Sequence, residues 1–149
     1  KQKGEFKMKK VYLASPFFND EEIKTMESVL EILRSKDLEV FAPFEHQNKH
    51  LEFGSMEWRK ATFKSDMDAV YESDIMVAIL DGNYSDSGTA FEIGAYSELK
   101  KPIIVINPNG KTINLMIAES LHAVITSFEE LKGYDFNELK ATPYTDYVW

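Results

Sequence analysis

The feature that most constrains the fold is an unbroken apolar run at residues 75–80, followed by a loop of small polar residues and then a helical pattern. Such a run is typical of a strand that is buried on both faces of a parallel sheet. Gly, Ser, Asn and Asp dominate residues 81–88, so we expect a turn there. Apolar spacing from Thr89 onward, with Lys100 and Lys101 at the end, predicts a helix. Because open α/β sheets bind ligands at the loops after their strands, this stretch is the first candidate for a site.

Glu92 lies in the first turns of this predicted helix. Oriented amides at a helix N-terminus favour an anion, so we expect Glu92 to stay charged at neutral pH. A fixed carboxylate is suited to nucleophilic attack, for example on the anomeric carbon of a sugar. Asp86 in the preceding loop would bind a hydroxyl or share the proton transfer. The alternative is that Asp86 or Ser87 only caps the helix and Glu92 is a solvated acid.

Composition bounds the class of protein. The 149 residues suffice for one domain, residues 1–149, with residues 1–9 expected as a disordered or added start. A formal net charge of −8 makes nucleic acid and anionic membranes poor partners and leaves a small ligand as the better one. The chain has no Cys, no apolar run of transmembrane length and no signal-peptide core. We therefore expect a cytoplasmic protein.

Strands and helices alternate along the rest of the chain. Asn19 precedes acidic residues and an apolar stripe at helical spacing, which predicts a capped helix between the first two strands. The predicted strands cover residues 10–16, 38–43, 75–80, 102–107 and 122–126. This order predicts an α/β fold with a doubly wound, flavodoxin-like, five-stranded parallel sheet that has helices on both faces.

Three other stretches carry candidate functions. Residues 44–58 are polar and aromatic, which is typical of a binding loop, and they include His46 and His50. A metal site would need further ligands, so solvated histidines are favoured over metal ligands. Residues 58–72 read as a helix that carries Asp66 and Asp68, and one of these acids is ordinarily exposed. The aromatic tail, residues 133–149, is expected to pack on its own domain or on a neighbouring subunit.

The sequence contains no GxGxxG fingerprint, no P-loop and no G-x-S-x-G motif. These absences disfavour dinucleotide binding, nucleoside triphosphate binding and a hydrolase serine of that type.

Several segments in register resemble one enzyme family. They are VYLASPFF (11–18), MEWRKATFKSDM (56–67), SDIM (73–76), SDSGTAFEIGAY (85–96) and INLMIA (113–118). Together they are similar to the nucleoside 2-deoxyribosyltransferases, particularly the purine-preferring branch, over nearly the whole chain. The resemblance implies transfer of a 2-deoxyribosyl group between nucleobases with retention of configuration, without a cofactor or a metal.

The resemblance also implies roles for individual residues. Glu92 matches the nucleophilic glutamate, whose carboxylate would attack C1′ of the nucleoside. Asp66 matches the aspartate near the base, a donor for the proton that the departing nitrogen needs. Asp86 matches the aspartate that helps to bind the sugar, and Tyr12 matches the tyrosine whose hydroxyl orients the nucleophile.

Other matches concern substrate binding and assembly. Asn114 matches a residue that contacts the 5′-hydroxyl across a subunit boundary, and Met116 lies beside the site. Gln47 is a looser match for a base-contacting glutamine. The family forms hexamers or smaller assemblies with shared sites, so the implied partners are nucleosides, free nucleobases and copies of the same chain. Family members commonly end in a tyrosine whose carboxylate takes part in the site, whereas this chain ends in Trp149.

Aromatic rings near the matched motifs would stack on a planar base. Phe17, Phe18 and Trp58 are the candidates, with ordinary core packing as the alternative for each. Gly88, in the small-residue loop, is a further candidate for contact with the substrate.

Two rival functions remain open from the sequence. An N-glycosidase of the same superfamily would use water in place of the acceptor base and would bind a 5′-phosphate. The loop at residues 14–18 offers Ser15 and no nearby Arg, which disfavours it. A non-catalytic nucleotide-binding module would bind its ligand independently of Glu92.

Overall fold

The computed structural model describes residues 7–80 and 85–149. Within these residues, five strands form one all-parallel sheet in the order β2-β1-β3-β4-β5. The strands are β1 (Lys10–Ala14), β2 (Glu39–Phe41), β3 (Ile75–Ile79), β4 (Ile103–Ile106) and β5 (Ala123–Ile125). This topology confirms the predicted α/β fold. The turn expected at residues 81–84 and the chain start at residues 1–6 lie outside the described residues.

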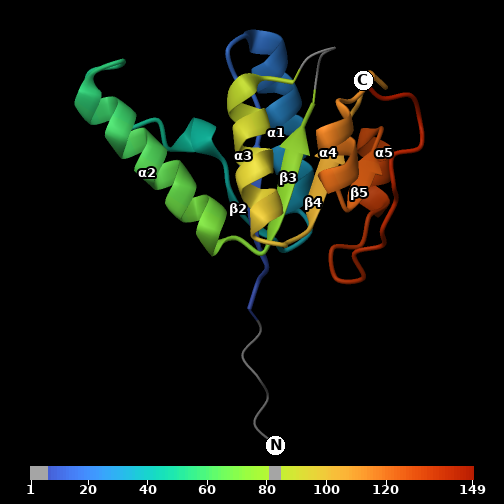
Figure 1. Ribbon diagram of the computed structural model, residues 1–149. Coiled ribbons are helices and arrows are strands. Elements are labelled where there is room, and N and C mark those ends of the chain that lie inside the picture. Colours follow the sequence, from blue (N-terminus) through green and yellow to red (C-terminus); the bar gives the residue numbers. More distant parts are fainter. Residues whose placement is uncertain (1–6, 81–84) are drawn as a thin grey trace, which may run out of the picture.

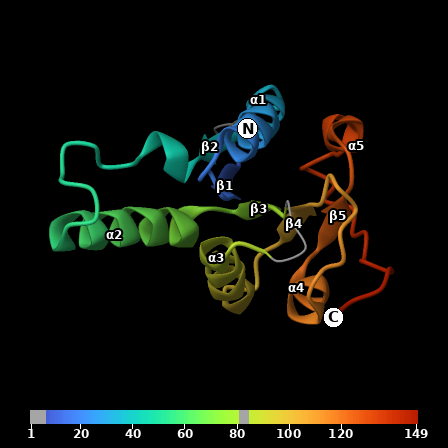
Figure 2. The ribbon, with the colours of Figure 1, turned by 90° about the horizontal axis from the view of Figure 1, so that it is seen from above.

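Helices cover both faces of the sheet (Figures 1 and 2). Their bounds are α1 (Asp20–Arg34), α2 (Met56–Glu72), α3 (Ser87–Glu98), α4 (Leu115–Ser120) and α5 (Phe128–Gly133), with the short 3-10 helix η1 (Pro43–Glu45) after β2. Seen from above, α1 and α5 lie on one side of the strands, and α2, α3 and α4 lie on the other (Figure 2). The core is divided in the same way, since Leu13 packs in the cluster on the α1 side and Tyr12 in the cluster on the α3 side.

Side-chain caps fix where several helices begin. The Asn19 side chain accepts the Glu22 backbone N–H at the start of α1, as predicted. Ser55 caps α2 and Asp86 caps α3 in the same way. For this reason α2 begins at Met56 and α3 at Ser87, each two residues earlier than the apolar spacing alone predicts.

The C-terminal tail packs on its own domain, one of the two arrangements expected. Isolated β-bridges join Val148 to Ile113 and Thr142 to Ala123, and Phe136 is buried in the core. In the described part of the chain, no helix combines the length and apolar character that a membrane crossing requires.

Candidate active site

A cleft of about 380 Å³ opens between the loop after β1, the helix α2 and the start of α3. It collects residues from segments that are far apart in the sequence. The sequence candidates that line it are Phe17, Phe18, Trp58, Asp66, Asp86, Gly88 and Glu92. Parallel strands end at one edge of the sheet, so the loop after β1 and the start of α3, which follows β3, meet there.

Tyr12 and Glu92 are joined across two elements of the fold. Tyr12 is fully buried on β1, and its hydroxyl donates a hydrogen bond to Glu92 Oε2. Burial, followed by the negative charges of Glu92 and Asp66, raises the pKa of the Tyr12 hydroxyl far above its usual value. Tyr12 is therefore a permanent proton donor that fixes one oxygen of the Glu92 carboxyl.

The electrostatic expectation for Glu92 needs correction. Burial raises the pKa of Glu92 to about 7, the Tyr12 hydrogen bond opposes this rise, and the charges of Asp66 and Asp86 add to it. Glu92 lies in the second turn of α3, beyond the free amides of the first turn, where stabilisation by the helix dipole has declined. Desolvation therefore dominates, and in the free protein the carboxyl is only about half ionised at pH 7.

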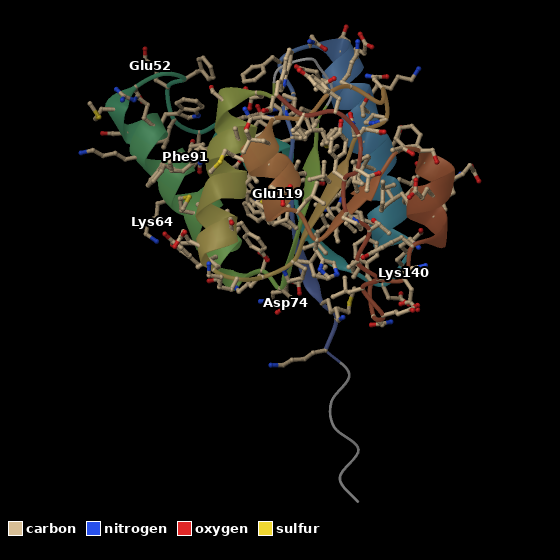
Figure 3. All side chains as sticks on the ribbon, turned by 45° about the vertical axis from the view of Figure 1, so that its right-hand side comes forward. Glu52, Lys64, Asp74, Phe91, Glu119 and Lys140 are labelled. Atoms are coloured by element: carbon tan, nitrogen blue, oxygen red, sulfur yellow. The ribbon has the colours of Figure 1, made fainter. Side chains whose placement is uncertain are left out.

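Of the two acids on α2, Asp66 faces the cleft. Burial raises the pKa of Asp66 to about 6. Its Oδ1 atom is buried without a hydrogen-bond partner among the described residues, so it is available to a ligand. Asp68, in contrast, is exposed and pairs with Lys64 at 2.5 Å. Figure 3 shows Lys64 on the outer side of α2.

Asp86 combines the two functions that the sequence left open. Its Oδ2 atom accepts hydrogen bonds from the Thr89 backbone N–H at 2.8 Å and from the Thr89 hydroxyl at 3.1 Å. The residue thus caps α3, and it also lines the cleft. A Cβ atom at Gly88 would come within 3.2 Å of the same oxygen, so a side chain there would press on the cap.

Aromatic rings form the walls of the cleft. Phe17 meets Phe44 edge-on, with ring centroids 5.4 Å apart. The Trp58 indole N–H donates to the Gln47 carbonyl oxygen at 2.9 Å, which fixes the orientation of the ring. Phe91 is exposed on the side of α3 that faces α2 (Figure 3). Its ring centroid lies 6.4 Å from that of Phe63 on α2.

The remaining sequence candidates lie away from this cleft in the single chain. The Gln47 side chain donates to the Phe44 carbonyl oxygen at 2.6 Å and lines a separate hollow with His46 and His50. Asn114 caps α4, and Met116 is 73% exposed. Both line a second pocket, of about 560 Å³, on the opposite side of α3. Their predicted contacts with the substrate stay predictions.

Sequence reasoning missed several side chains of α2 that line the cleft, above all Arg59. Arg59 is the only cationic residue among the described ones that line this cleft. It precedes Asp66 by two helical turns, so helical periodicity was a signal that could have found it. The loop after β1 has no basic residue, and α2 supplies a cation to the cleft through Arg59.

The histidines of the loop after β2 do not gather other ligands. Among residues 7–80 and 85–149, no group of three or more His, Cys, Asp or Glu side chains could hold a metal ion. His46 instead stacks on Phe41, with ring centroids 4.3 Å apart.

Comparisons with known proteins show the family to which the chain belongs. The profile of the family described as "Nucleoside 2-deoxyribosyltransferase" matches residues 11–132. A nucleoside deoxyribosyltransferase of Limosilactobacillus fermentum is 33% identical over 91% of this chain and 90% of its own length. One of Lactobacillus leichmannii is 26% identical over 87% of this chain and 91% of its own. A solved 2-deoxyribosyltransferase of Bacillus psychrosaccharolyticus is 44% identical, with a TM-score of 0.88 over 91% of this chain and 99% of its own. The chain therefore belongs to the nucleoside 2-deoxyribosyltransferase family of enzymes.

Proposed function

We propose that the protein transfers the 2-deoxyribosyl group from one nucleobase to another, through a covalent intermediate on Glu92 and with retention of configuration. The observation that carries this proposal is the Glu92 carboxyl in the cleft, held by the Tyr12 hydroxyl and electrostatically coupled to Asp66. No cofactor is needed for the reaction.

The chemistry follows in two displacements. A Glu92 carboxylate oxygen attacks C1′, the C1′–N bond breaks, and its electron pair goes to the departing base nitrogen. That nitrogen takes a proton from the Asp66 carboxyl. A nitrogen of the second base then attacks C1′ and releases the Glu92 carboxylate, while the N–H proton of that base returns to Asp66. Two inversions at C1′ keep the original configuration.

This division of labour requires Glu92 and Asp66 together to carry one proton. Glu92 must be ionised to attack, and Asp66 must be protonated to donate. The pKa of about 7 for Glu92 and of about 6 for Asp66 mean that the pair carries a single proton between about pH 6 and 7. Because Glu92 has the higher pKa, this proton lies mainly on Glu92 in the free protein. The reaction therefore requires substrate binding to move it to Asp66, next to the base nitrogen.

We propose that purine deoxynucleosides are favoured. The aromatic walls supply the support, since Phe17 and Trp58 line the same cleft as the acids and offer rings to a planar bicyclic base. Asp86 and Gly88, at the start of α3, would lie against the sugar.

The central experiment pairs a donor with an acceptor. Deoxyinosine is incubated with the protein with and without adenine, and the products are separated by chromatography. Transfer predicts deoxyadenosine only when adenine is present. Release of hypoxanthine at the same rate with and without adenine would instead support hydrolysis. Cytosine as the alternative acceptor tests the purine preference, because equal rates with both acceptors would contradict it.

We further propose a cytoplasmic homo-oligomer, a hexamer or smaller, in which Asn114 and Met116 of one copy complete the cleft of another. Both residues are exposed and lie on the far side of α3 from their own cleft. The test mixes two poorly active variants, Glu92→Gln and Asn114→Ala, after dissociation and reassembly. Shared sites predict that activity recovers, because some mixed sites contain neither substitution. Activity that stays at the mean of the two separate variants would contradict the sharing.

A second function, N-glycosidase action on a deoxynucleoside 5′-phosphate, gains support from one observation. Arg59 lines the cleft together with Ser15, so a phosphate would find a cation there. Deoxyinosine and its 5′-monophosphate are compared as donors, in the wild type and in Arg59→Gln. The transferase proposal predicts that the unphosphorylated donor is used at least as well. A strong preference for the monophosphate that is lost in Arg59→Gln would favour the glycosidase.

A further inference from the structure

We infer that His46 is a positioning residue for the nucleophile, which acts on Glu92 through Phe41 and Tyr12. The inference rests on the proposed role of Glu92 and assigns a function to the loop after β2. The basis is a stack of aromatic rings that connects this exposed loop with the buried tyrosine.

The three rings lie nearly parallel. Tyr12 on β1 and Phe41 on β2 are register partners in the sheet. Their ring centroids are 5.7 Å apart with 13° between the planes. His46 follows on Phe41, with centroids 4.3 Å apart and 6° between the planes. The Tyr12 hydroxyl at the inner end of the stack donates to Glu92.

The position of β2 explains why Phe41 depends on the His46 ring for packing. The sheet order places β2 at an edge, so Phe41 has a neighbouring strand on one side only. Phe41 is half-buried, and the exposed His46 ring supplies a stacking surface that the sheet does not. Stacked aromatic pairs contribute more than their buried area alone, so removal of the ring loosens Phe41.

The residues on both sides of His46 are anchored, which keeps its ring over Phe41. Glu45 accepts two hydrogen bonds from the Arg34 guanidinium, at 2.5 and 3.0 Å. The Gln47 carbonyl oxygen accepts the indole N–H of Trp58, which itself lines the cleft. The loop is therefore held at two points that flank the stacking residue.

Looser packing at Phe41 would reach the chemistry through the Tyr12 hydroxyl. This hydrogen bond fixes the direction of the attacking carboxyl, and small misplacements of a reacting group are costly in rate. His46 lines a hollow separate from the cleft, so we expect it to make no direct contact with the nucleoside. The expected effect is therefore on kcat, with KM unchanged.

The test compares His46→Ala with the aromatic replacement His46→Phe and with His50→Ala in the same loop. His50 is exposed, and it lies four residues after His46 in the same loop. We expect kcat for base exchange to fall by about threefold to tenfold in His46→Ala. The KM for the deoxynucleoside should stay at the wild-type value, His46→Phe should restore kcat, and His50→Ala should match the wild type.

A second readout is the pH dependence of the rate. The titratable groups that face Glu92 are the Tyr12 hydroxyl, Asp66 and Asp86. Of these, only the Tyr12 hydrogen bond lowers the pKa of Glu92. His46→Ala should therefore move the acid limb of the kcat profile to higher pH, and His46→Phe should return it. Loss of a merely structural contact would leave that limb in place.

Some outcomes would overturn the inference. One is that kcat and the acid limb of the pH profile are unchanged in His46→Ala. The other is a loss of kcat in His46→Ala that His46→Phe does not restore. Phe41→Leu gives an independent check, because it removes the middle ring and should reproduce the lower kcat and the shifted limb in protein with a normal circular dichroism spectrum. Failure of the proposed role of Glu92 would give a different result, since Glu92→Gln would then show full turnover.

Discussion

The two sides of α3 present opposite chemistry although they belong to one helix. Toward α2, the cleft contains Asp66, Asp86 and Glu92 against aromatic rings. Toward α4, the second pocket is lined largely by amide, hydroxyl and aliphatic groups, with Glu98 as its one acid among the described residues. On the first side, burial raises the pKa of Asp66 and of Glu92. The difference teaches that the reactivity of Glu92 comes from its neighbours across the cleft rather than from its helix.

The largest expected loss of activity distinguishes Glu92 from Glu98, two glutamates on opposite sides of α3. Glu92→Gln keeps the size of the side chain and removes the attacking oxygen anion. Base exchange should fall by about 10³-fold or more, because the covalent route is lost. Glu98→Gln, the matched control, should stay within about twofold of the wild type. Rates of deoxyadenosine formation from deoxyinosine check both, and near-normal exchange in Glu92→Gln would remove it from the mechanism.

A second pair of variants compares the acids of α2. Asp66→Asn removes the proton donor and should lower base exchange by about 10²-fold, within the range of general acid catalysis. Asp68→Asn changes an exposed carboxylate that pairs with Lys64 on the outer side of α2, so it should have little effect. Steady-state kinetics on both variants make the comparison. Equal losses would indicate that α2 tolerates no change rather than that Asp66 acts on the base.

The pH profile tests whether the two acids work as a coupled pair. The productive state carries one proton, so kcat/KM should be greatest between about pH 6 and 7, where the pKa values of about 6 for Asp66 and about 7 for Glu92 leave one proton on the pair. Below this window both acids are protonated and no carboxylate is left to attack. Above it both are ionised, so Asp66 has no proton to give. In Asp66→Asn the alkaline limb should disappear. A profile that is flat from pH 5 to 8 would contradict the coupling.

The same comparison explains how far the sequence could predict the structure. The apolar run of β3 and the capping residues Asn19 and Asp86 act locally, so the topology and the start of α1 followed from neighbouring residues. The pKa of Glu92 did not follow, because it depends on burial beside Asp66 and on the Tyr12 hydroxyl, which come from distant segments. Helical periodicity places Arg59 on the same face of α2 as Asp66, but the packing of α2 in the fold decides that this face lines the cleft.

The pH dependence of the free energy of unfolding should show how far burial of the Glu92 carboxyl destabilises the fold. Because its pKa is raised from 4.5 to about 7, folded Glu92 binds more protons than the unfolded chain between these values. The free energy of unfolding of the wild type therefore declines as pH rises through that window, and Glu92→Gln lacks this decline. Urea unfolding measures the free energy of unfolding of Glu92→Gln minus that of the wild type. This difference should be larger at pH 8 than at pH 4.5, by on the order of 2 kcal/mol. An equal difference at both pH values would contradict the burial of this charge.

The smallest expected effect concerns the side of α3 that faces α4. A Cβ atom at Gly94 would meet nothing within 4 Å, and the residue is in the middle of the helix. Gly94→Ala should raise the free energy of unfolding by about 0.5–1 kcal/mol, since Ala loses less backbone entropy on folding. Thermal unfolding and kinetics at fixed protein concentration check this. Loss of assembly or of activity would indicate that another copy approaches this face closely.

The most direct test of the central claim is to locate the sugar on the protein. The enzyme is mixed with deoxyinosine without an acceptor base, denatured within the first turnovers and digested, and its peptides are identified by mass spectrometry. The account predicts a deoxyribosyl ester on Glu92 that is absent from Glu92→Gln and disappears when adenine is added before denaturation. An adduct on any other side chain would contradict it.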